Sequence, residues 1–381
     1  MRNNKKFYCI QYLLQKKDRN GRIPRLFLVL SRVRGPGKTY SVVEWLFKVL
    51  RDGAYIGDNF LKGKFVLIVR QVNELGETAE GMLKSYVNDH FPEKTIEEVV
   101  KKTHSEVYLV TTHTEVVFNK MTGEDEEKVE YEREHIGYVV PLRRANKIKK
   151  ISSKFVDAVH AVFDEFLTED NDYLTDEVDK FLTIHTSLAR GHGESIRYYP
   201  VYMLANCIDI GNPYFVSMEL NRYIQPGTLS YRGDGFVYQR YESDELASRH
   251  DEVGLGTIFK RSKANNFKDN SWLNEKGSLV EKPQKGWGRY IYCATLAADD
   301  DTFGLVYYDK IGLYYITYSV DPSCKAVYSI TREGMPNVQS IKNSLCLQNL
   351  RKNFLAGLVR IQSAQMHSML MDLVSGGTKR N

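Results

Sequence analysis

Short apolar runs alternate with segments of helical periodicity over the first half of the chain. Four runs have the length and composition of buried strands, at residues 26–30, 65–69, 156–163 and 199–204. Apolar residues recur at helical spacing in segments 39–51, 74–88 and 172–188. Continuous apolar runs are typical of parallel strands covered on both faces, so the alternation predicts an α/β domain with a mostly parallel sheet.

The rest of the chain shows a different texture. Between the second and third core strands, an insertion of about residues 104–154 predicts antiparallel strands at 106–110, 114–119 and 135–140, and we expect it to leave the core on one side. Glycine, proline and aromatic punctuation places a boundary near Gly227, giving domains 1–226 and 227–381. In the second domain, runs at 287–295, 302–309, 312–319 and 325–331 predict strands, and 340–374 predicts one or two helices. We expect a smaller α+β domain there.

Composition narrows the classes of protein. With 42% hydrophobic and 27% charged residues and no long apolar stretch, the chain predicts a globular protein without a membrane function. The basic N-terminus lacks the features of a signal peptide, so we expect a cytoplasmic protein. The nine histidines show no metal-ligand spacing, and His160 is interpreted as a core residue. Five scattered cysteines argue against a disulfide framework and a zinc site: Cys9, Cys207, Cys293, Cys324 and Cys346.

The segment SRVRGPGKT follows the first strand and opens the first helix. Glycines let backbone N–H groups converge on phosphates, the Lys38 ammonium reaches the β and γ oxygens, and the Thr39 hydroxyl suits magnesium. The pattern G-x-x-x-x-G-K-[ST] has lost its first glycine, which is Arg32 here. The candidate nucleotide-binding residues of this loop are Arg32, Arg34, Gly35, Pro36, Gly37, Lys38, Thr39 and Tyr40.

Two adjacent acids end the third core strand, in the sequence AVFDE. Asp164 is the candidate magnesium ligand, and Glu165 is the candidate base that polarises the attacking water. Acids that merely cap the following turn are the alternative. The preceding GxGKT favours the catalytic interpretation, and Lys38 and Glu165 are both predicted to be catalytic.

Two further polar residues are candidates on weaker patterns. Arg190 ends a predicted helix before a glycine-containing loop, where it is positioned to reach a neighbouring subunit's γ-phosphate, and Arg197 is its rival. Pairing with the helix dipole is the other role open to Arg190. Asn206 closes the fourth strand as a candidate sensor of the γ-phosphate, or as a turn former.

Charge is distributed unevenly within a net charge of +5. An acidic segment, 123–134, precedes a basic segment, 141–154, which contains no acid. One interpretation is a solvated hairpin whose two arms balance. The other is a sequence-independent handle for duplex DNA phosphates, for which the candidates are Lys120, Arg143, Arg144, Lys147, Lys149 and Lys150.

Together, GPGKT, VLIVRQ, VFDEF, LARG and LANCIDIGNPYF resemble the DNA encapsidation ATPases of small tailed phages, over residues 26–215. That family is related to terminase large subunits, within the P-loop ATPases that carry an extra strand and a catalytic glutamate. The resemblance implies ATP and magnesium as cofactors, Lys38 and Thr39 as the phosphate-loop pair, and Arg190 as a finger acting in trans. It makes Arg32 or Arg34 the additional arginine of the loop.

The resemblance also implies partners and a location. Family members form a ring, usually a pentamer, around double-stranded DNA at the portal vertex of the prohead, in some cases with a structural prohead RNA. The protein is then expected in the host cytoplasm, transiently at the portal, and not in the mature virion. The second domain is expected to resemble a vestigial ribonuclease H-type nuclease, because Asp309, Asp321 and residues 299–301 do not form a persuasive two-metal set.

The sequence therefore predicts ATP-driven translocation of viral DNA into a preformed capsid. A helicase or recombinase using the same site on single strands is one alternative, although no aromatic-rich groove accompanies the basic segment. A non-hydrolysing, nucleotide-regulated capsid assembly module is the other, and Glu165 argues against it.

Overall fold

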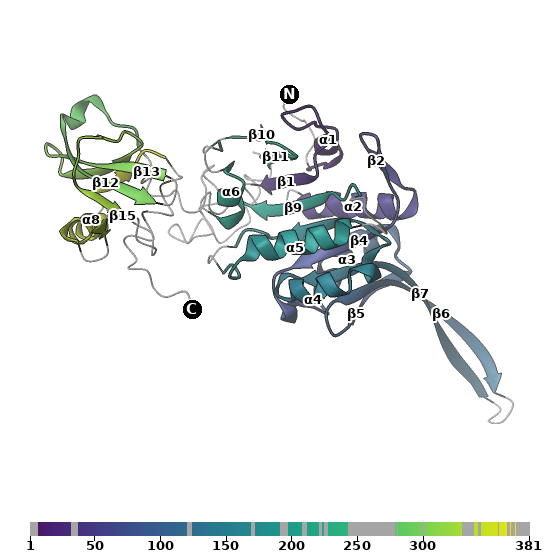
Figure 1. Ribbon diagram of the computed structural model, residues 1–381. Helices are drawn as coiled ribbons and strands as arrows, with labels where there is room; N and C mark the ends of the chain where they lie inside the picture. The colour runs from purple at the N-terminus through teal and green to yellow at the C-terminus, as the bar shows by residue number, and fades with distance from the viewer. Residues whose placement is uncertain are drawn as a thin grey trace, which may run out of the picture. The chain divides into compact units, whose positions relative to one another are not determined.

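The computed structural model divides into two compact units (Figure 1). The first unit comprises Met1–Ile208 and Gly227–Asn270, and the second comprises Asp209–Pro226 and Ser271–Asn381. The structure describes residues 7–31, 37–119, 124–168, 172–190, 197–207, 212–220, 223–224, 228–242, 279, 281–298, 301–329, 339–341, 344–356, 358–363, 366 and 370.

A nine-stranded sheet forms the centre of the first unit, in the order β10-β11-β1-β9-β8-β4-β7-β6-β5. The strands are β1 (Leu26–Ser31), β4 (Lys64–Val69), β5 (Lys94–Val100), β6 (Ser105–Asn119), β7 (Glu124–Pro141), β8 (Ala158–Asp164), β9 (Val201–Asn206), β10 (Ser230–Arg232) and β11 (Phe236–Tyr241). All neighbours from β11 to β7 pair in parallel. The four predicted core strands are confirmed as β1, β4, β8 and β9, which lie side by side.

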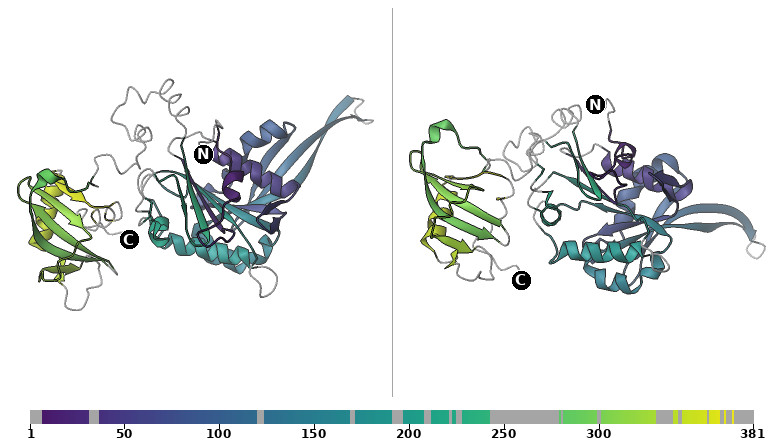
Figure 2. Two further views of the ribbon diagram at one scale, coloured as in Figure 1. Left: turned by 90° about the horizontal axis from the view of Figure 1, so that it is seen from above. Right: turned by 45° about the horizontal axis from the view of Figure 1, so that its top comes forward.

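Helices cover both faces of this sheet. They are α1 (Gln11–Leu14), α2 (Lys38–Arg51), α3 (Thr78–His90), α4 (Ala145–Lys150) and α5 (Glu177–Ala189), with 3-10 turns η1 (Val72–Glu74), η2 (Leu142–Arg144) and η3 (Ser152–Phe155). Figure 2 shows α2 and α3, in purple and blue, across the sheet from the teal α5. Helix α2 buries its apolar stripe, and the Trp45 indole donates to the Tyr202 hydroxyl at 2.7 Å. The mixed α/β fold with a mostly parallel sheet is confirmed.

The insertion differs from the prediction in two ways. Segments 106–110 and 114–119 belong to the single strand β6, and the end of β7 pairs in parallel with β4, so the root of the insertion extends the main sheet. The basic segment is not an arm of the hairpin, because it forms η2, α4 and η3 after β7 ends. The balanced-hairpin interpretation is therefore wrong.

The first unit extends beyond the domain boundary predicted near Gly227. Strand β11 pairs in parallel with β1, and β10 pairs with β11, so the first sheet continues to Tyr241. The glycine and aromatic punctuation marks a loop that leads to an edge strand rather than the end of the core. The small hairpin of β2 (Ala54–Ile56) and β3 (Asn59–Leu61) also belongs to the first unit.

The second unit has a six-stranded sheet in the order β16-β15-β12-β13-β14-β17. Its elements are β12 (Tyr290–Ala298), β13 (Asp301–Tyr308), β14 (Leu313–Thr317), β15 (Val327–Ser329), β16 (Gln339–Ser340), β17 (Val359–Ile361), α6 (Pro213–Ser217), η8 (Lys285–Trp287) and α8 (Leu345–Leu355). Strand β17 replaces part of the helical segment predicted for 340–374, since three residues are too few to show an alternating pattern. None of the described helices combines the length and apolarity needed to cross a membrane.

Candidate nucleotide-binding site

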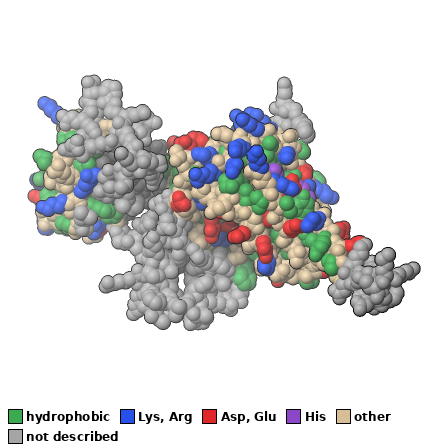
Figure 3. Space-filling model, turned by 90° about the horizontal axis from the view of Figure 1, so that it is seen from below, with side chains coloured by type: hydrophobic (Ala, Val, Ile, Leu, Met, Phe, Trp, Pro, Cys, Tyr) green, Lys and Arg blue, Asp and Glu red, His purple; other side chains and the backbone are tan. Residues whose placement is uncertain are grey.

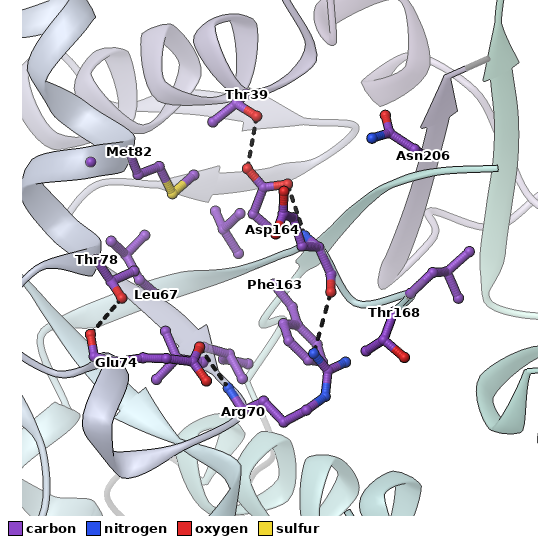
Figure 4. Close-up of a pocket in the computed structure, with 16 residues that line it drawn as sticks. Thr39, Leu67, Arg70, Glu74, Thr78, Met82, Phe163, Asp164, Thr168 and Asn206 are labelled. Atoms are coloured by element: carbon purple, nitrogen blue, oxygen red, sulfur yellow. Dashed lines mark hydrogen bonds between the residues drawn. The ribbon is translucent and has the colours of Figure 1, made fainter. Parts of the chain in front are cut away.

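Polar side chains gather where four neighbouring parallel strands end. Strands β1, β9 and β8 close with Ser31, Asn206 and Asp164, and Arg70 follows the last residue of β4. Ser31 and Asn206 are register partners, so their side chains start from adjacent positions. A cavity of about 720 Å³ opens beside this edge and is lined in part by Thr39, Arg70, Asp164 and Asn206 (Figure 4).

Lys38 is the first residue of α2 and its ammonium reaches back to the strand ends. Gly37 caps the helix in the left-handed region, with φ 80°, which a residue with a Cβ adopts at a cost. The Lys38 ammonium donates to Ser31 Oγ at 2.8 Å and to Asn206 Oδ1 at 3.0 Å. The structure thus brings together two predicted site residues, Lys38 and Asn206. Ser31, which the sequence did not single out, joins them.

Thr39 and Asp164 meet across the same edge. The Thr39 hydroxyl donates to Asp164 Oδ2 at 2.7 Å, as Figure 4 shows. Burial raises the pKa of the Asp164 carboxyl, although the Thr39 hydrogen bond and the Lys38 charge oppose this shift. A carboxylate held in this way is poised to accept a cation.

Glu165 follows Asp164 in an uncommon backbone conformation. Its φ is 52°, in the left-handed region that costs a non-glycine residue about 1–2 kcal/mol. Its backbone N–H donates to Asp164 Oδ1 at 2.9 Å, and its side chain is exposed. Strain of this kind persists where the surrounding structure holds the backbone, and Glu165 is one of the residues that line the cavity.

Arg70 is a second site residue that sequence reasoning missed, after Ser31. Its Nε donates to both Glu177 carboxylate oxygens, at 3.1 and 2.9 Å, and its Nη2 donates to the Phe166 carbonyl at 2.9 Å. Its Nη1 reaches the Glu165 carbonyl at 3.5 Å, and its guanidinium lies 5.4 Å from the Phe163 ring centroid. The signal was its place directly after the apolar run VLIV, which corresponds to the place of Glu165 after β8.

Six other predicted site residues lie away from the cavity or outside the described residues. The Tyr40 hydroxyl donates to Asp89 Oδ2 on α3 at 3.0 Å, and its side chain does not line the cavity. Residues 32–36, which include Arg32, Arg34, Gly35 and Pro36, lie outside the described part of the chain, as does Lys120.

Arg190 and Arg197 lie at the opposite edge of the sheet. Arg190 is exposed at the end of α5, and the Arg197 backbone N–H donates to the Ala189 carbonyl there. The Arg197 guanidinium makes four hydrogen bonds, two to the carbonyl of Leu188 near the end of α5 and one each to the carbonyls of Phe155 and Val156 just ahead of β8. Strands of this length span about 20 Å, so neither arginine can serve the nucleotide site of its own chain.

The basic segment runs from the carboxyl edge across the face that α5 covers. The Arg143 backbone N–H donates to the Arg70 carbonyl at 3.3 Å, and its guanidinium donates to Gln71 Oε1 at 3.1 Å. Lys147, Lys149 and Lys150 are exposed on α4, and Arg144 is half-buried. Figure 3 shows Lys and Arg side chains gathered on the face seen from below.

The donor set suits a magnesium nucleotide. The first N–H groups of α2 have no partner within the helix, and with the Lys38 ammonium they form a cationic seat for phosphate oxygens. The Thr39 hydroxyl and the Asp164 carboxylate supply the oxygen ligands that Mg²⁺ prefers. Among the described residues, no group of three or more His, Cys, Asp and Glu side chains forms a separate metal site.

Fold and site define an α/β protein whose polar side chains converge at the carboxyl edge of a mostly parallel sheet. The chain belongs to the family described as Podovirus DNA encapsidation protein (Gp16), which matches residues 62–377. The resemblance inferred from the sequence is thereby confirmed.

Individual relatives agree with this placement. The chain is 24% identical over 244 residues to the DNA packaging protein of Bacillus phage phi29, covering 62% of this chain and 70% of that protein. It is 25% identical over 242 residues to the DNA packaging protein of Bacillus phage B103, covering 61% and 71%.

Solved structures show the likeness in fold. A chain of the bacteriophage Phi-29 viral genome packaging motor assembly is similar, with a TM-score of 0.61, 20% identity, and coverage of 98% of this chain and 99% of that chain. A chain of the Phi-28 gp11 DNA packaging motor has a TM-score of 0.50 at 17% identity, with 97% of each chain covered. At these identities the comparison speaks to the fold alone.

Proposed function

We propose that this chain is a packaging motor ATPase that hydrolyses ATP to drive double-stranded viral DNA into a preformed capsid. The observation that carries the proposal is the convergence of Lys38, Thr39 and Asp164 with Asn206 at one sheet edge, in a member of a DNA encapsidation family. A charged helix start facing a strand-end acid is the arrangement that phosphoryl transfer requires.

The residues divide the chemistry between them. The Lys38 ammonium neutralises phosphate charge. Thr39 and Asp164 would hold Mg²⁺, which would supply positive charge to stabilise the phosphate oxygens during transfer. Glu165, exposed beside the cavity, orients the attacking water and accepts its proton. Because Asn206 Oδ1 accepts from Lys38, a γ-phosphate that draws Lys38 away changes the contact of Asn206, which is the basis of a sensor role.

Arg190 is proposed to act on a neighbouring subunit. It is exposed at the amino edge, whereas the nucleotide site lies at the carboxyl edge, so a ring in which one edge meets the other completes every site. The Arg197 guanidinium is committed to backbone carbonyls, which favours Arg190 over its rival. A heterologous contact that closes makes a ring, and we propose a pentamer at the portal of the prohead.

The basic segment is proposed to grip duplex phosphates without reading their sequence. Its exposed lysines on α4 present charge without acid neighbours in the segment. Affinity for duplex DNA should then fall steeply with salt. Stimulation of ATP hydrolysis by single-stranded rather than duplex DNA would favour a helicase or recombinase instead.

The second unit is proposed to be a degenerate nuclease domain that contacts DNA or the capsid. Support comes from its mixed sheet, in which an antiparallel meander, β12 to β14, is extended by β15 in parallel with β12. Asp309 accepts from the backbone of Lys310, and Asp321 accepts from Ser323, so each carboxylate caps its own turn. Manganese-dependent nicking of plasmid that Asp309→Ala abolishes would refute the proposal.

One assay tests the motor site. ATP hydrolysis is measured with and without duplex DNA for the parent, for Glu165→Gln, and for an equimolar mixture of the parent with Arg190→Ala. Loss of activity in Glu165→Gln, and a mixture that departs from the average of its components, are expected of shared sites in a ring. A fully active Glu165→Gln removes the catalytic assignment.

A further inference from the structure

Strands β6 and β7 continue far beyond the main sheet as a two-stranded ribbon. Eight residue pairs, from Thr112↔Tyr131 to Asn119↔Glu124, have no further strand beside them. The pairing of β6 with β5 ends at Thr111, and the pairing of β7 with β4 begins only at Gly137. At about 3.4 Å per residue, this ribbon extends about 27 Å from the sheet. Figure 1 shows it projecting from the first unit.

The ribbon is acidic and carries exposed apolar side chains. Segment 124–134, which comprises the β7 strand of the ribbon and the three residues at its root, contains seven acids and two bases, a net charge of −5. Tyr131 is 62% exposed and Val129 is 41% exposed on the same strand. A two-stranded hairpin is only marginally stable in water, so a ribbon of this length is best explained by a surface that receives it. Its charge repels DNA and selects a basic protein surface.

The root of the ribbon lies at the amino edge of the sheet. His135 of β7, which lies between the ribbon and the residues that pair with β4, contacts Lys64 at the start of β4, with 2.8 Å between Nδ1 and Nζ. The Lys64 ammonium also pairs with Asp157, just ahead of β8, at 2.7 Å. Arg190 lies at this same edge, so the ribbon and the proposed finger belong to one side of the subunit.

The opposite edge carries a basic site in the corresponding place. Strand β7 lies two positions from β8 in the sheet, about 10 Å away, and Arg143 and Arg144 follow its carboxyl end. At the amino edge, the ribbon on β7 is displaced sideways from Arg190, which lies beside β8, by about two strands. At the carboxyl edge, Arg143 after β7 is displaced from Asp164 at the end of β8 by the same two strands. A neighbour that presents its amino edge to this carboxyl edge brings the ribbon over the two arginines.

We propose that the ribbon of one copy docks on Arg143 and Arg144 of the next copy and clamps adjacent subunits of the ring. This proposal rests on the proposed ring with its shared nucleotide site. It assigns the two arginines to the contact between copies, and it leaves Lys147, Lys149 and Lys150 on α4 as the DNA handle. Acidic side chains and Tyr131 against guanidinium groups are the contacts that steer and hold such an interface.

Charge exchange tests the contact directly. Three variants of the full chain are compared with the parent: Glu130→Lys with Glu132→Lys, Arg143→Glu with Arg144→Glu, and all four changes together. Sedimentation velocity over a concentration series with a non-hydrolysable ATP analogue gives the dissociation constant between copies. Asp52→Lys with Asp58→Lys is the control, because it changes the net charge as the ribbon variant does, at two exposed acids outside the ribbon.

Each pair alone is expected to weaken association about tenfold or more, and the fourfold variant is expected to recover most of the loss. The clamp is overturned if the ribbon variant matches the control, or if the fourfold variant stays as weak as the arginine pair. Prohead binding lost with association between copies intact also overturns it, in favour of the capsid as the docking partner. A parent that neither associates nor hydrolyses ATP with duplex DNA and proheads removes the proposed function as well, whereas an active, assembling parent confines the failure to the ribbon.

Discussion

Arg70 has two roles that can be tested separately. Its guanidinium neutralises the buried Glu177 carboxylate, and it also holds the backbone carbonyls of Glu165 and Phe166. Its side chain is 11% exposed and pairs with the fully buried carboxylate of Glu177. Arg70→Met leaves that carboxylate without its cation, which costs about 3–5 kcal/mol of unfolding free energy for a buried pair. In a unit of this size the loss lowers the melting temperature by about 6–20 °C.

Removing both charges separates the two roles. In Arg70→Met with Glu177→Gln, the amide still accepts from the Leu174 N–H, which donates to Glu177 Oε2 at 2.7 Å in the parent. Stability should therefore return to near that of the parent. Activity should not return, because the Glu165 and Phe166 carbonyls have lost the guanidinium that positions the catalytic turn.

The assay is a melting curve with steady-state ATP hydrolysis on the same samples. We expect kcat to fall about a hundredfold in both variants, the scale of a misplaced catalytic group, with KM for ATP little changed since Lys38 and Thr39 remain. If the double variant recovers kcat together with stability, Arg70 only balances a buried charge. An unchanged melting temperature in Arg70→Met would refute the reasoning about the pair itself.

Three further predictions follow from the same geometry. Arg197→Ala should lower the unfolding free energy by at least about 2 kcal/mol, because four charge-assisted hydrogen bonds are lost. Arg190→Ala should leave the melting curve unchanged and abolish ATP hydrolysis, and equal melting curves for the two variants would contradict this distinction. Asp164→Asn should keep or raise stability at neutral pH, since the raised pKa of Asp164 means that its ionised form is unfavourable once folded, while magnesium-dependent hydrolysis is lost; a large fall in melting temperature would count against this. Burial lowers the pKa of His160 to about 3, so the stability gained from a neutral imidazole is present above pH 6.5 and lost as the pH falls toward 3; urea titrations at pH 7 and 5 should differ by about 2 kcal/mol more in the parent than in His160→Phe.

Much of the site was readable from the sequence because its residues sit at strand ends. Apolar runs fixed where β1, β4, β8 and β9 lie along the chain, and a residue that closes a parallel strand must face the edge where ligands bind. Asp164 and Asn206 were predicted in this way, and Lys38 and Thr39 were predicted from the GPGKT motif at the start of α2. The structure brings Lys38 into contact with Asn206 and Thr39 into contact with Asp164. The same logic applied to Arg70 would have found it, but an arginine after an apolar run carries no motif of its own.

Only the tertiary structure decided which edges and faces the remaining charges occupy. In the sequence, the acidic and basic segments are neighbours. In the structure, β7 pairs in parallel with β4, so the basic segment that follows β7 lies at the carboxyl edge, whereas the acidic ribbon lies on the side of the amino edge. Arg190 and Arg197 look alike in sequence, and they differ because the Arg197 guanidinium meets carbonyls from the segment ahead of β8. Strand order is set by long-range pairing, which no local window of sequence contains.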